Sequence, residues 1–203
     1  VAGGVGTAPV YPQVKWLHEH GIDADVIMGS RTKDLLFYMD EMKAVAGNVY
    51  VCTDDGTYGF HGNGCQQLQA LIDEGKHYDV CVAIGPMIMM KFVCLLTKKY
   101  EIPTDVSLNT IMVDGTGMCG ACRITVGGKT KFVCVDGPEF DGHQVDFDEM
   151  LKRMGAFKNI EREEMHKLDT VCEATKETDE KSRNVAWRQE LRKSMKAKER
   201  TAI

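Results

Sequence analysis

The residues with the clearest potential for chemistry are three cysteines and an aspartate that lie between positions 114 and 134. Asp114, Cys119, Cys122 and Cys134 follow the spacing of a plant-type [2Fe–2S] ligand set, with a carboxylate in place of the first thiolate. Glycines surround them, and the N–H groups of a glycine-rich loop bond to cluster sulfurs and raise the reduction potential. The pattern predicts an iron–sulfur cluster and therefore a protein that moves electrons.

Two other interpretations of this segment stay open. Cys119 and Cys122 equally form half of a zinc site, which Cys134 together with Asp114 or His143 would complete. Asp114 could instead form a turn, with another group as the fourth ligand, although its register before Cys119 favours ligation. The remaining five cysteines are expected to be buried or bystander thiols rather than ligands: Cys52, Cys65, Cys81, Cys94 and Cys172.

Short strands are expected to present this ligand loop. Residues 106–112 and 131–135 have strand-like sequences, and residues 123–126 with the Gly127-Gly128 turn predict a hairpin between them. Cys134 would then lie on a strand. The segment is predicted to be a small antiparallel unit, followed by helices.

Strands and helices alternate over the first hundred residues. After a strand stub at the start, strands are predicted at residues 24–29, 48–52 and 78–84, and helices at residues 11–20, 35–42, 62–74 and 87–99. This alternation predicts an α/β fold with a parallel sheet, taken here as five-stranded with a truncated first strand, whose ligands gather at the carboxyl ends of the strands.

Glycine-rich and charged turns fall at those carboxyl ends. Gly3, Gly4 and Gly6 would let the backbone approach a pyrophosphate, whose charge the amides at the start of a helix neutralise. The spacing is not the strict G-x-G-x-x-G pattern, so an ordinary strand-to-helix turn explains it equally well.

Four runs together resemble the nicotinamide-nucleotide domain of ferredoxin–NADP reductase-like flavoproteins: residues 3–9, 29–31, 53–59 and 83–86. The resemblance implies a pyrophosphate at the first run, the adenosine ribose near the second and the nicotinamide near Gly85-Pro86. Many members have Cys where this chain has Ile84, so a thiol cannot assist hydride transfer from that position. Arg31 could pair with a 2′-phosphate, but Arg is also common as a solvated residue at a helix start. The choice between NADH and NADPH stays open, and the subfamily named below favours NADH. The implied nucleotide-binding residues are Gly3, Gly4, Gly6, Thr7, Ala8, Pro9, Gly29, Ser30, Arg31, Asp54, Asp55, Gly56, Gly85 and Pro86.

The run from Asp114 to Arg123 narrows this resemblance. It is similar to the small subunits of NADH-dependent reduced ferredoxin:NADP oxidoreductases, also called sulfide dehydrogenases, in which the Asp is a cluster ligand. The resemblance implies that electrons pass between NAD(P)H, FAD and a [2Fe–2S] cluster held by Asp114, Cys119, Cys122 and Cys134. From there they would reach a glutamate-synthase-like flavoprotein, as a separate subunit or a fused domain, with ferredoxin as a further possible partner. FAD would be held mainly by a barrel that precedes this chain, so the chain alone is expected to be inactive.

Two alternatives to this function are kept. The nearer one is an electron-transfer subunit of dihydroorotate dehydrogenase B, which more often has a fourth Cys in place of Asp114. From another class, the chain could be a zinc-binding interaction module.

Composition agrees with an enzyme of the cytoplasm. The chain has 203 residues, a formal charge of −5 and no apolar stretch near the ~20 residues of a membrane span, so neither nucleic acid nor a membrane is expected as partner. Eight cysteines without a signal peptide indicate reduced thiols and metal ligands.

The chain reads as a piece of a longer protein, cut at both ends. The expected organisation is a nucleotide domain at residues 1–104, a cluster unit at 105–148, helices at 149–178 and a basic segment at 179–203. The last segment, around residues 187–192, resembles a linker or the start of the partner flavoprotein.

Overall fold

The computed structural model describes residues 1–178, with side chains to residue 168, and divides into two compact units. The first is Val1–Met154, and the described part of the second contains the helix α7 (Lys158–Thr178). The basic segment expected at residues 179–203 lies outside the described residues. Among the described helices, none is long and apolar enough to cross a membrane.

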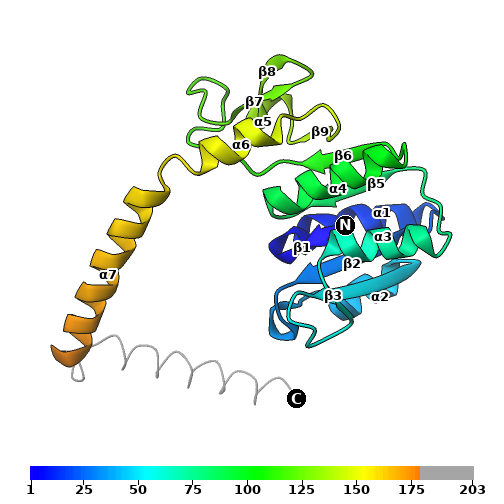
Figure 1. Cartoon of the computed structure of the whole chain (residues 1–203), viewed down its shortest axis with the longest axis horizontal. Helices are drawn as coiled ribbons and strands as arrows, with labels where there is room; N and C mark the ends of the chain where they lie inside the picture. Colours follow the sequence, from blue (N-terminus) through cyan, green and yellow to red (C-terminus); the bar gives the residue numbers. More distant parts are fainter. Residues whose placement is uncertain (179–203) are drawn as a thin grey trace, which may run out of the picture. The chain divides into compact units, whose positions relative to one another are not determined.

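The first unit is built around one sheet in the order β4-β3-β2-β1-β5-β6-β9 (Figure 1). All neighbouring strands are parallel except the pair β6 and β9. The strands are β1 (Ala2–Gly3), β2 (Asp25–Ser30), β3 (Asn48–Thr53), β4 (Phe60–His61), β5 (Cys81–Ile84), β6 (Thr104–Ser107) and β9 (Glu139–Asp141).

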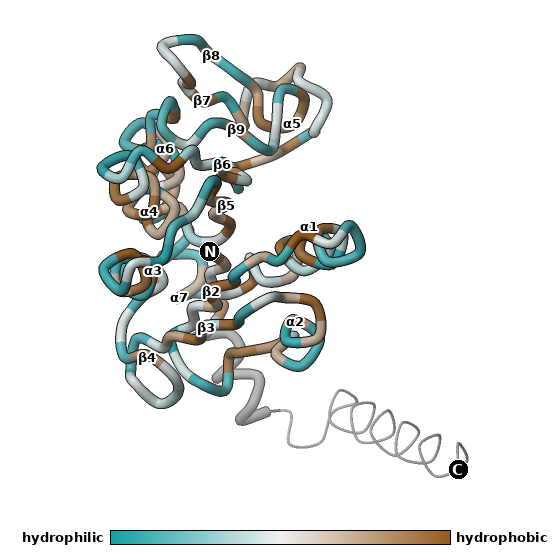
Figure 2. The backbone as a smooth tube through the Cα atoms, turned by 90° about the vertical axis from the view of Figure 1, so that its right-hand side faces the viewer, coloured by the Kyte–Doolittle hydropathy of each residue, from teal (hydrophilic) through white to brown (hydrophobic). Residues whose placement is uncertain are grey.

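Helices cover both faces of this sheet (Figure 2). On one face, α1 (Thr7–Glu19) and α2 (Met39–Val45) bury Val10, Val14 and Met42 against β1 and β2. On the other face, α3 (Gly64–Asp73) and α4 (Met87–Lys99) bury Leu68, Leu71, Met90 and Val93. Both faces of the central strands are therefore apolar, as a parallel sheet requires.

The α/β class predicted from the sequence is confirmed, with the very short first strand at the centre of the sheet. Two details of that prediction were wrong. The sheet has seven strands instead of five: the four strands whose positions were predicted, β1, β2, β3 and β5, are extended by β4 at one edge and by β6 and β9 at the other. The second helix begins at Met39 rather than at Leu35, because Leu36 is extended and Tyr38 has a φ of 58°, which interrupts a right-handed helix.

The hairpin in the cysteine-rich segment forms as predicted. It consists of β7 (Arg123–Val126) and β8 (Lys129–Phe132), joined by Gly127 and Gly128 with φ of 56° and 74°. These left-handed dihedrals suit a two-residue turn that matches the twist of the strands.

The strands expected beside this hairpin were placed wrongly. Residues 106–112 do not form a strand of the cluster unit, because β6 ends at Ser107 and pairs with β5 in the main sheet. Residues 131–135 divide between β8 and the one-turn helix α5 (Val133–Asp136), so Cys134 lies on a helix instead of a strand. Val133 is fully buried, which draws the chain inward at this point.

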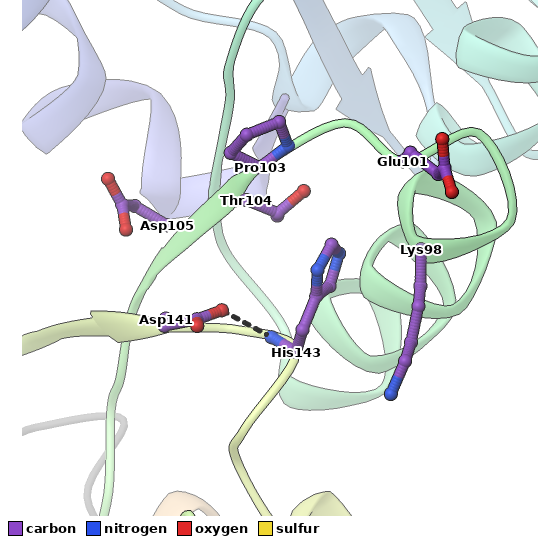
Figure 3. Close-up of a pocket in the computed structure, with 7 residues that line it drawn as sticks. All are labelled: Lys98, Glu101, Pro103, Thr104, Asp105, Asp141 and His143. Carbon is purple, nitrogen blue, oxygen red and sulfur yellow. Dashed lines mark hydrogen bonds between the residues drawn. The ribbon is translucent and has the colours of Figure 1, made fainter.

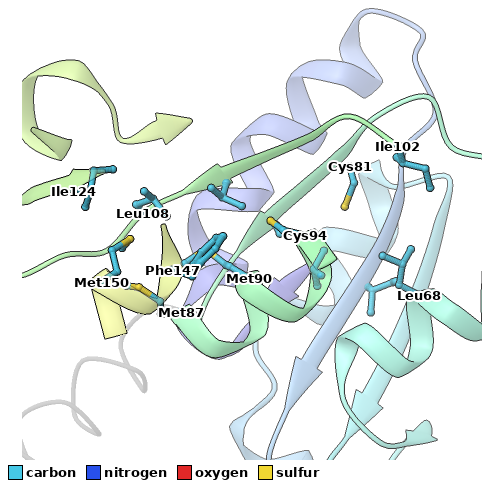
Figure 4. Close-up of a cluster of buried hydrophobic side chains, with 14 of the residues drawn as sticks. Leu68, Cys81, Met87, Met90, Cys94, Ile102, Leu108, Ile124, Phe147 and Met150 are labelled. Atoms are coloured by element: carbon cyan, nitrogen blue, oxygen red, sulfur yellow. The ribbon is translucent and has the colours of Figure 1, made fainter. Parts of the chain in front are cut away.

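One apolar core joins the sheet to the cysteine-rich segment. The helix α6 (Phe147–Met154) packs against α4 and β7 and buries Phe147 and Met150. Figure 4 shows these side chains beside Met87, Met90, Leu108 and Ile124. The hairpin is thus held to the sheet by hydrophobic burial as well as by the chain connection.

Candidate nucleotide and iron–sulfur sites

Two of the candidate nucleotide-binding turns pack directly against each other at the carboxyl edge of the sheet. β1 ends at Gly3, a 3-10 turn covers Gly4–Gly6, and α1 begins at Thr7. A Cβ on Gly6 would lie 2.2 Å from the carbonyl oxygen of Ile84, and one on Gly3 would lie 2.7 Å from Pro86 Cδ. Only glycine allows this approach, which brings the pyrophosphate turn expected before α1 next to the Gly85-Pro86 turn.

The start of α1 offers backbone donors at this junction. No side chain caps the helix, whose N-cap residue is Gly6, and Thr7 is buried. The first-turn N–H groups of a helix have no partner within the helix, and they carry partial positive charge. Thr7 already donates its N–H to the carbonyl oxygens of Gly4 and Val5, and Pro9 has no N–H, so the candidate donors here are those of Gly6 and Ala8. The residues expected to face a pyrophosphate are nevertheless brought together at this junction.

The other two turns also lie side by side. The N–H of Asp54 donates to Ser30 O at 3.0 Å, and the N–H of Asp55 donates to Arg31 O at 3.2 Å. The Asp55 carboxylate accepts bonds from the Thr57 hydroxyl at 2.7 Å and the Thr57 N–H at 3.0 Å. These bonds, the hydroxyl first, hold the pKa of Asp55 below its usual value. Gly29, near the end of β2, lies between Gly3 of β1 and Cys52 of β3. Gly56, in the turn after β3, has a φ of 71°.

The structure adds Lys33 and Tyr58 to this part of the site, which the sequence reasoning did not select. The N–H of Lys33 donates to Thr57 Oγ1 at 3.0 Å, and Lys33 Nζ lies 5.4 Å from the centroid of the Tyr58 ring. Tyr58 is partly exposed. A half-exposed aromatic ring beside the cationic side chain of Lys33 suits a base and a phosphate. The signal in the sequence was an aromatic residue between glycines in a turn after a strand.

Two of the candidate cluster ligands lie close together. Cys122 Sγ and Cys134 Sγ are 3.3 Å apart, with Cys122 buried at the start of the hairpin and Cys134 on α5. Burial alone would raise the pKa of Cys122, but hydrogen bonding with the backbone and the thiol of Cys134 outweighs it and lowers that pKa. Cys119 is exposed, and its Sγ accepts a bond from the N–H of Ala121 at 3.4 Å.

Asp114 organises the loop around Cys119. Its Oδ1 accepts the N–H of Thr116 at 2.8 Å, and its Oδ2 accepts the N–H of Cys119 at 3.0 Å. The Thr116 bond is the largest cause of a lowered pKa for this carboxyl. In the described part of the chain, no three His, Cys, Asp or Glu side chains lie close enough to hold one metal ion. The structure therefore pairs Cys122 with Cys134 and Asp114 with Cys119, and it does not bring all four to one point.

The donor set nevertheless fits an iron–sulfur cluster. Three thiols and a carboxylate lie on two adjoining segments, and thiolates are the usual ligands of cluster iron. Gly115, Gly117 and Gly120 have φ of 75°, 84° and 65°, which lets the loop curl with its N–H groups available to sulfur.

His143 lies elsewhere. Its Nε2 is 3.0 Å from Thr97 Oγ1, which also accepts a bond from the Thr104 hydroxyl at 2.6 Å, and its N–H donates to Asp141 Oδ1 at 2.9 Å. His143 lines an open hollow of about 530 Å³. Figure 3 shows it there with the other lining residues, Lys98, Glu101, Pro103, Thr104, Asp105 and Asp141. A zinc site completed by His143 is therefore not supported.

The other described cysteines behave as structural thiols. Cys52, Cys81 and Cys94 are buried and Cys65 is half-buried. Burial raises the pKa of Cys52 to about 11 and that of Cys94 to about 12, so both stay protonated at neutral pH. The side chain of Cys172 lies beyond the described residues.

The fold and this segment together define an α/β nucleotide-binding unit of the ferredoxin-reductase-like type joined to an iron–sulfur segment. Residues 109–146 match the iron–sulfur cluster binding domain of dihydroorotate dehydrogenase B. The resemblance found in the sequence is confirmed: the chain is similar to electron-transfer subunits of the dihydroorotate dehydrogenase B type and to an NADH-dependent reduced ferredoxin–NADP oxidoreductase.

Individual relatives show the extent of the similarity. The chain is 64% identical over 162 residues to an uncharacterized protein of Clostridium beijerinckii, covering 79% of this chain and 55% of that protein. It is 50% identical over 162 residues to a dihydroorotate dehydrogenase B electron transfer subunit homolog of Thermotoga maritima, covering 80% and 57%. A solved structure of an NADH-dependent reduced ferredoxin–NADP oxidoreductase, described for flavin-based electron bifurcation, is 46% identical, with a TM-score of 0.73 and coverage of 82% and 60%. The chain thus spans a little over half the length of these relatives.

Proposed function

We propose that this chain is the nicotinamide-nucleotide and [2Fe–2S] part of a flavin-dependent oxidoreductase of the ferredoxin:NADP oxidoreductase type. One observation carries the proposal. The sheet has four glycine-rich or charged turns at its carboxyl edge, and it is followed in the same unit by a cysteine segment, residues 109–146, that matches an iron–sulfur cluster binding domain. In this proposal the protein exchanges electrons between NAD(P)H, FAD and the cluster, and passes them to a partner flavoprotein.

The four turns at the carboxyl edge would bind and orient the dinucleotide. Gly3 and Gly6 are buried where the two turns pack together, while Gly4 and Gly85 are partly exposed beside the exposed side chain of Val5. A pyrophosphate would approach the first turn of α1 at these partly exposed glycines. The second pair of turns presents Arg31, Asp54 and Asp55 to the adenosine ribose. With Ile84 before Gly85, no thiol lies at that position to assist hydride transfer to or from the nicotinamide.

Asp114, Cys119, Cys122 and Cys134 would hold the cluster. When bound, the cluster supplies one-electron transfer, which a two-electron hydride donor cannot do alone. The chain contributes thiolates, a loop rich in N–H donors and a carboxylate, which as a harder donor than thiolate changes the potential. The cluster type and the FAD belong to the proposal, as does a cytoplasmic location.

The partner we propose is a glutamate-synthase-like flavoprotein, because of the run Asp114–Arg123, with ferredoxin as a further partner. A second function is favoured by the names of several relatives: an electron-transfer subunit of dihydroorotate dehydrogenase B, as in Geobacillus thermodenitrificans, whose subunit is 36% identical over 149 residues. Copurification with the full-length protein would identify the partner. A copurifying flavoprotein that oxidises dihydroorotate would support this second function.

The decisive experiment is anaerobic purification of the full-length protein with counts of iron, acid-labile sulfide and flavin. We expect two irons and two sulfides per chain for a [2Fe–2S] cluster. Cys119→Ser should remove most of the iron, because a hydroxyl is a poor ligand for cluster iron. The matched control is Cys65→Ser, which changes a half-buried thiol on α3 and should leave the iron content unchanged.

Two results would contradict the proposal. Zinc without iron or sulfide would identify the zinc-binding interaction module instead. Full cluster content in Cys119→Ser would show that this thiol is not a ligand.

A further inference from the structure

Two arginines donate hydrogen bonds to the loop between Cys119 and Cys122. Arg153 Nη2 on α6 donates to the carbonyl oxygen of Ala121 at 3.0 Å, and Arg123 Nη1 donates to that of Gly120 at 3.3 Å. These two carbonyls belong to consecutive peptide groups within the Cys119-x-x-Cys122 sequence. Two guanidinium charges therefore lie directly beside the short segment that links two of the candidate ligands.

One of these peptide groups already bonds to a ligand sulfur. The peptide that joins Gly120 to Ala121 accepts from Arg123 at its oxygen and donates its N–H to Cys119 Sγ at 3.4 Å. A cation at the carbonyl oxygen polarises the peptide and makes the N–H at its other end a stronger donor. The charge of Arg123 is thus transmitted to the Cys119 sulfur through a single peptide group.

Arg153 acts from a fixed position. It is half-buried, and its helix is anchored by the buried Phe147 and Met150 and by the ion pair between Asp148 and Lys91 at 2.5 Å. Arg153 lines a small cavity with Thr110, Ile111, Ala121, Arg123, Met150 and Met154. Because water screens a charge less in such a place, the guanidinium should influence the loop more than an exposed lysine would.

We propose that Arg123 and Arg153 are positioning residues that clamp the loop between Cys119 and Cys122 and raise the reduction potential of the cluster held there. This inference rests on the function proposed above. Reduction adds one negative charge to the cluster. Positive charge and stronger N–H donors beside its sulfurs stabilise the reduced form more than the oxidised form.

The test is a redox titration of the anaerobically purified holoprotein, monitored by EPR of the reduced cluster. In Arg153→Gln we expect at least a tenfold smaller equilibrium constant for reduction, which for a one-electron couple is a potential lower by about 59 mV. Arg123→Gln should also lower the potential. Arg153→Lys keeps the charge and should retain most of the potential of the original protein.

Lys152→Gln is the matched control. Lys152 precedes Arg153 on α6, carries the same charge and is exposed, and its side chain makes no hydrogen bond or ion pair with the described part of the chain. Its variant should change the equilibrium constant less than twofold. A shift as large as that of Arg153→Gln would reduce the effect to general surface charge and overturn the proposed contact.

The remaining outcomes separate the two proposals. If the original protein contains no iron and sulfide, the proposed function fails. If Arg153→Gln binds a full cluster with an unchanged potential, the arginine inference fails while the function stands. If Arg153→Gln loses the cluster, the variant Arg123→Gln, at an exposed position, provides the test. A lower reduction potential in Arg123→Gln supports the inference, and an unchanged potential overturns it.

Discussion

At the amino-terminal end of β2, the Asp25 carboxylate accepts hydrogen bonds from three side chains. The donors are Asn48 Nδ2 at 2.7 Å, Lys76 Nζ at 3.1 Å and the Tyr78 hydroxyl at 3.1 Å. Burial alone would raise the pKa of Asp25, but the three donors outweigh it and lower that pKa. This hydrogen-bond network lies at the edge of the sheet opposite the candidate nucleotide turns. It connects β2, β3 and the segment before β5.

Asp25→Asn should lower the free energy of unfolding by about 1–3 kcal/mol at neutral pH, since hydrogen bonds to a charged group are lost. Because the carboxyl has a lower pKa when folded, its contribution is complete above the unfolded value of about 3.9 and disappears as the pH falls through the folded pKa. Urea unfolding from pH 3 to pH 7 should therefore show a difference between the proteins that shrinks below about pH 4. The exposed Asp23, replaced by Asn, is the control, and an equal loss in that variant would contradict the network.

At the scale of elements, the junction of the first turn with the Gly85-Pro86 turn depends on missing side chains. In Gly6→Ala the new Cβ would meet the backbone of Ile84, which cannot move without distorting β5. We expect a loss of about 1–3 kcal/mol in stability and at least tenfold weaker NAD(P)H binding, measured by fluorescence titration.

Gly21→Ala supplies the comparison. Gly21 has a φ of 73°, and apart from its chain neighbours no heavy atom lies within 4 Å of the position that an alanine methyl group would occupy. Alanine there should therefore cost only the strain of a left-handed backbone conformation, roughly 1–2 kcal/mol. Nucleotide affinity should be unchanged in this variant. Equal affinities in the Gly6 and Gly21 variants would mean that the turn junction does not form the binding surface.

The elements also show where sequence patterns are sufficient. The helix predicted at residues 87–99 matches α4 at both ends, because Pro86 precedes it and apolar residues recur at helical spacing. The strand predicted through Cys134 was wrong, since a short apolar run does not distinguish a strand from one helical turn. The burial of Val133, a tertiary effect, decided it.

At the scale of the whole molecule, the nucleotide turns and the cysteine segment share one hydrogen-bonded framework. β6 pairs with β5 on one side and with β9, which follows the cysteines, on the other. The boundary expected between residues 104 and 105 therefore falls inside β6, although the separation into nucleotide and cluster regions stays a prediction.

Native-state hydrogen exchange of the full-length protein tests this framework. Amides of β9 should exchange with protection similar to that of β5 and β6, because they open only when the sheet opens. The amides of the β7–β8 hairpin, which pairs only with itself in the described residues apart from one bridge to Val145, should exchange faster. If β9 exchanged as fast as the hairpin, the cysteine segment would be an independent unit.

The sequence by itself determined which side chains and turns are available for chemistry. Residue types and spacing identified three thiols, a carboxylate and four glycine-rich or charged turns, because ligand chemistry and glycine dihedrals are local properties. The tertiary structure decided what lies beside them. Lys33 and Tyr58 lie beside the candidate nucleotide turns, and the Asp114 carboxylate accepts hydrogen bonds from the loop backbone. His143 contacts Thr97 instead of the cysteines, and Arg153 contacts the loop between Cys119 and Cys122. Contacts across 32 residues, as between Arg153 and Ala121, arise from the packing of α6 on the core and leave no periodic signal in the sequence.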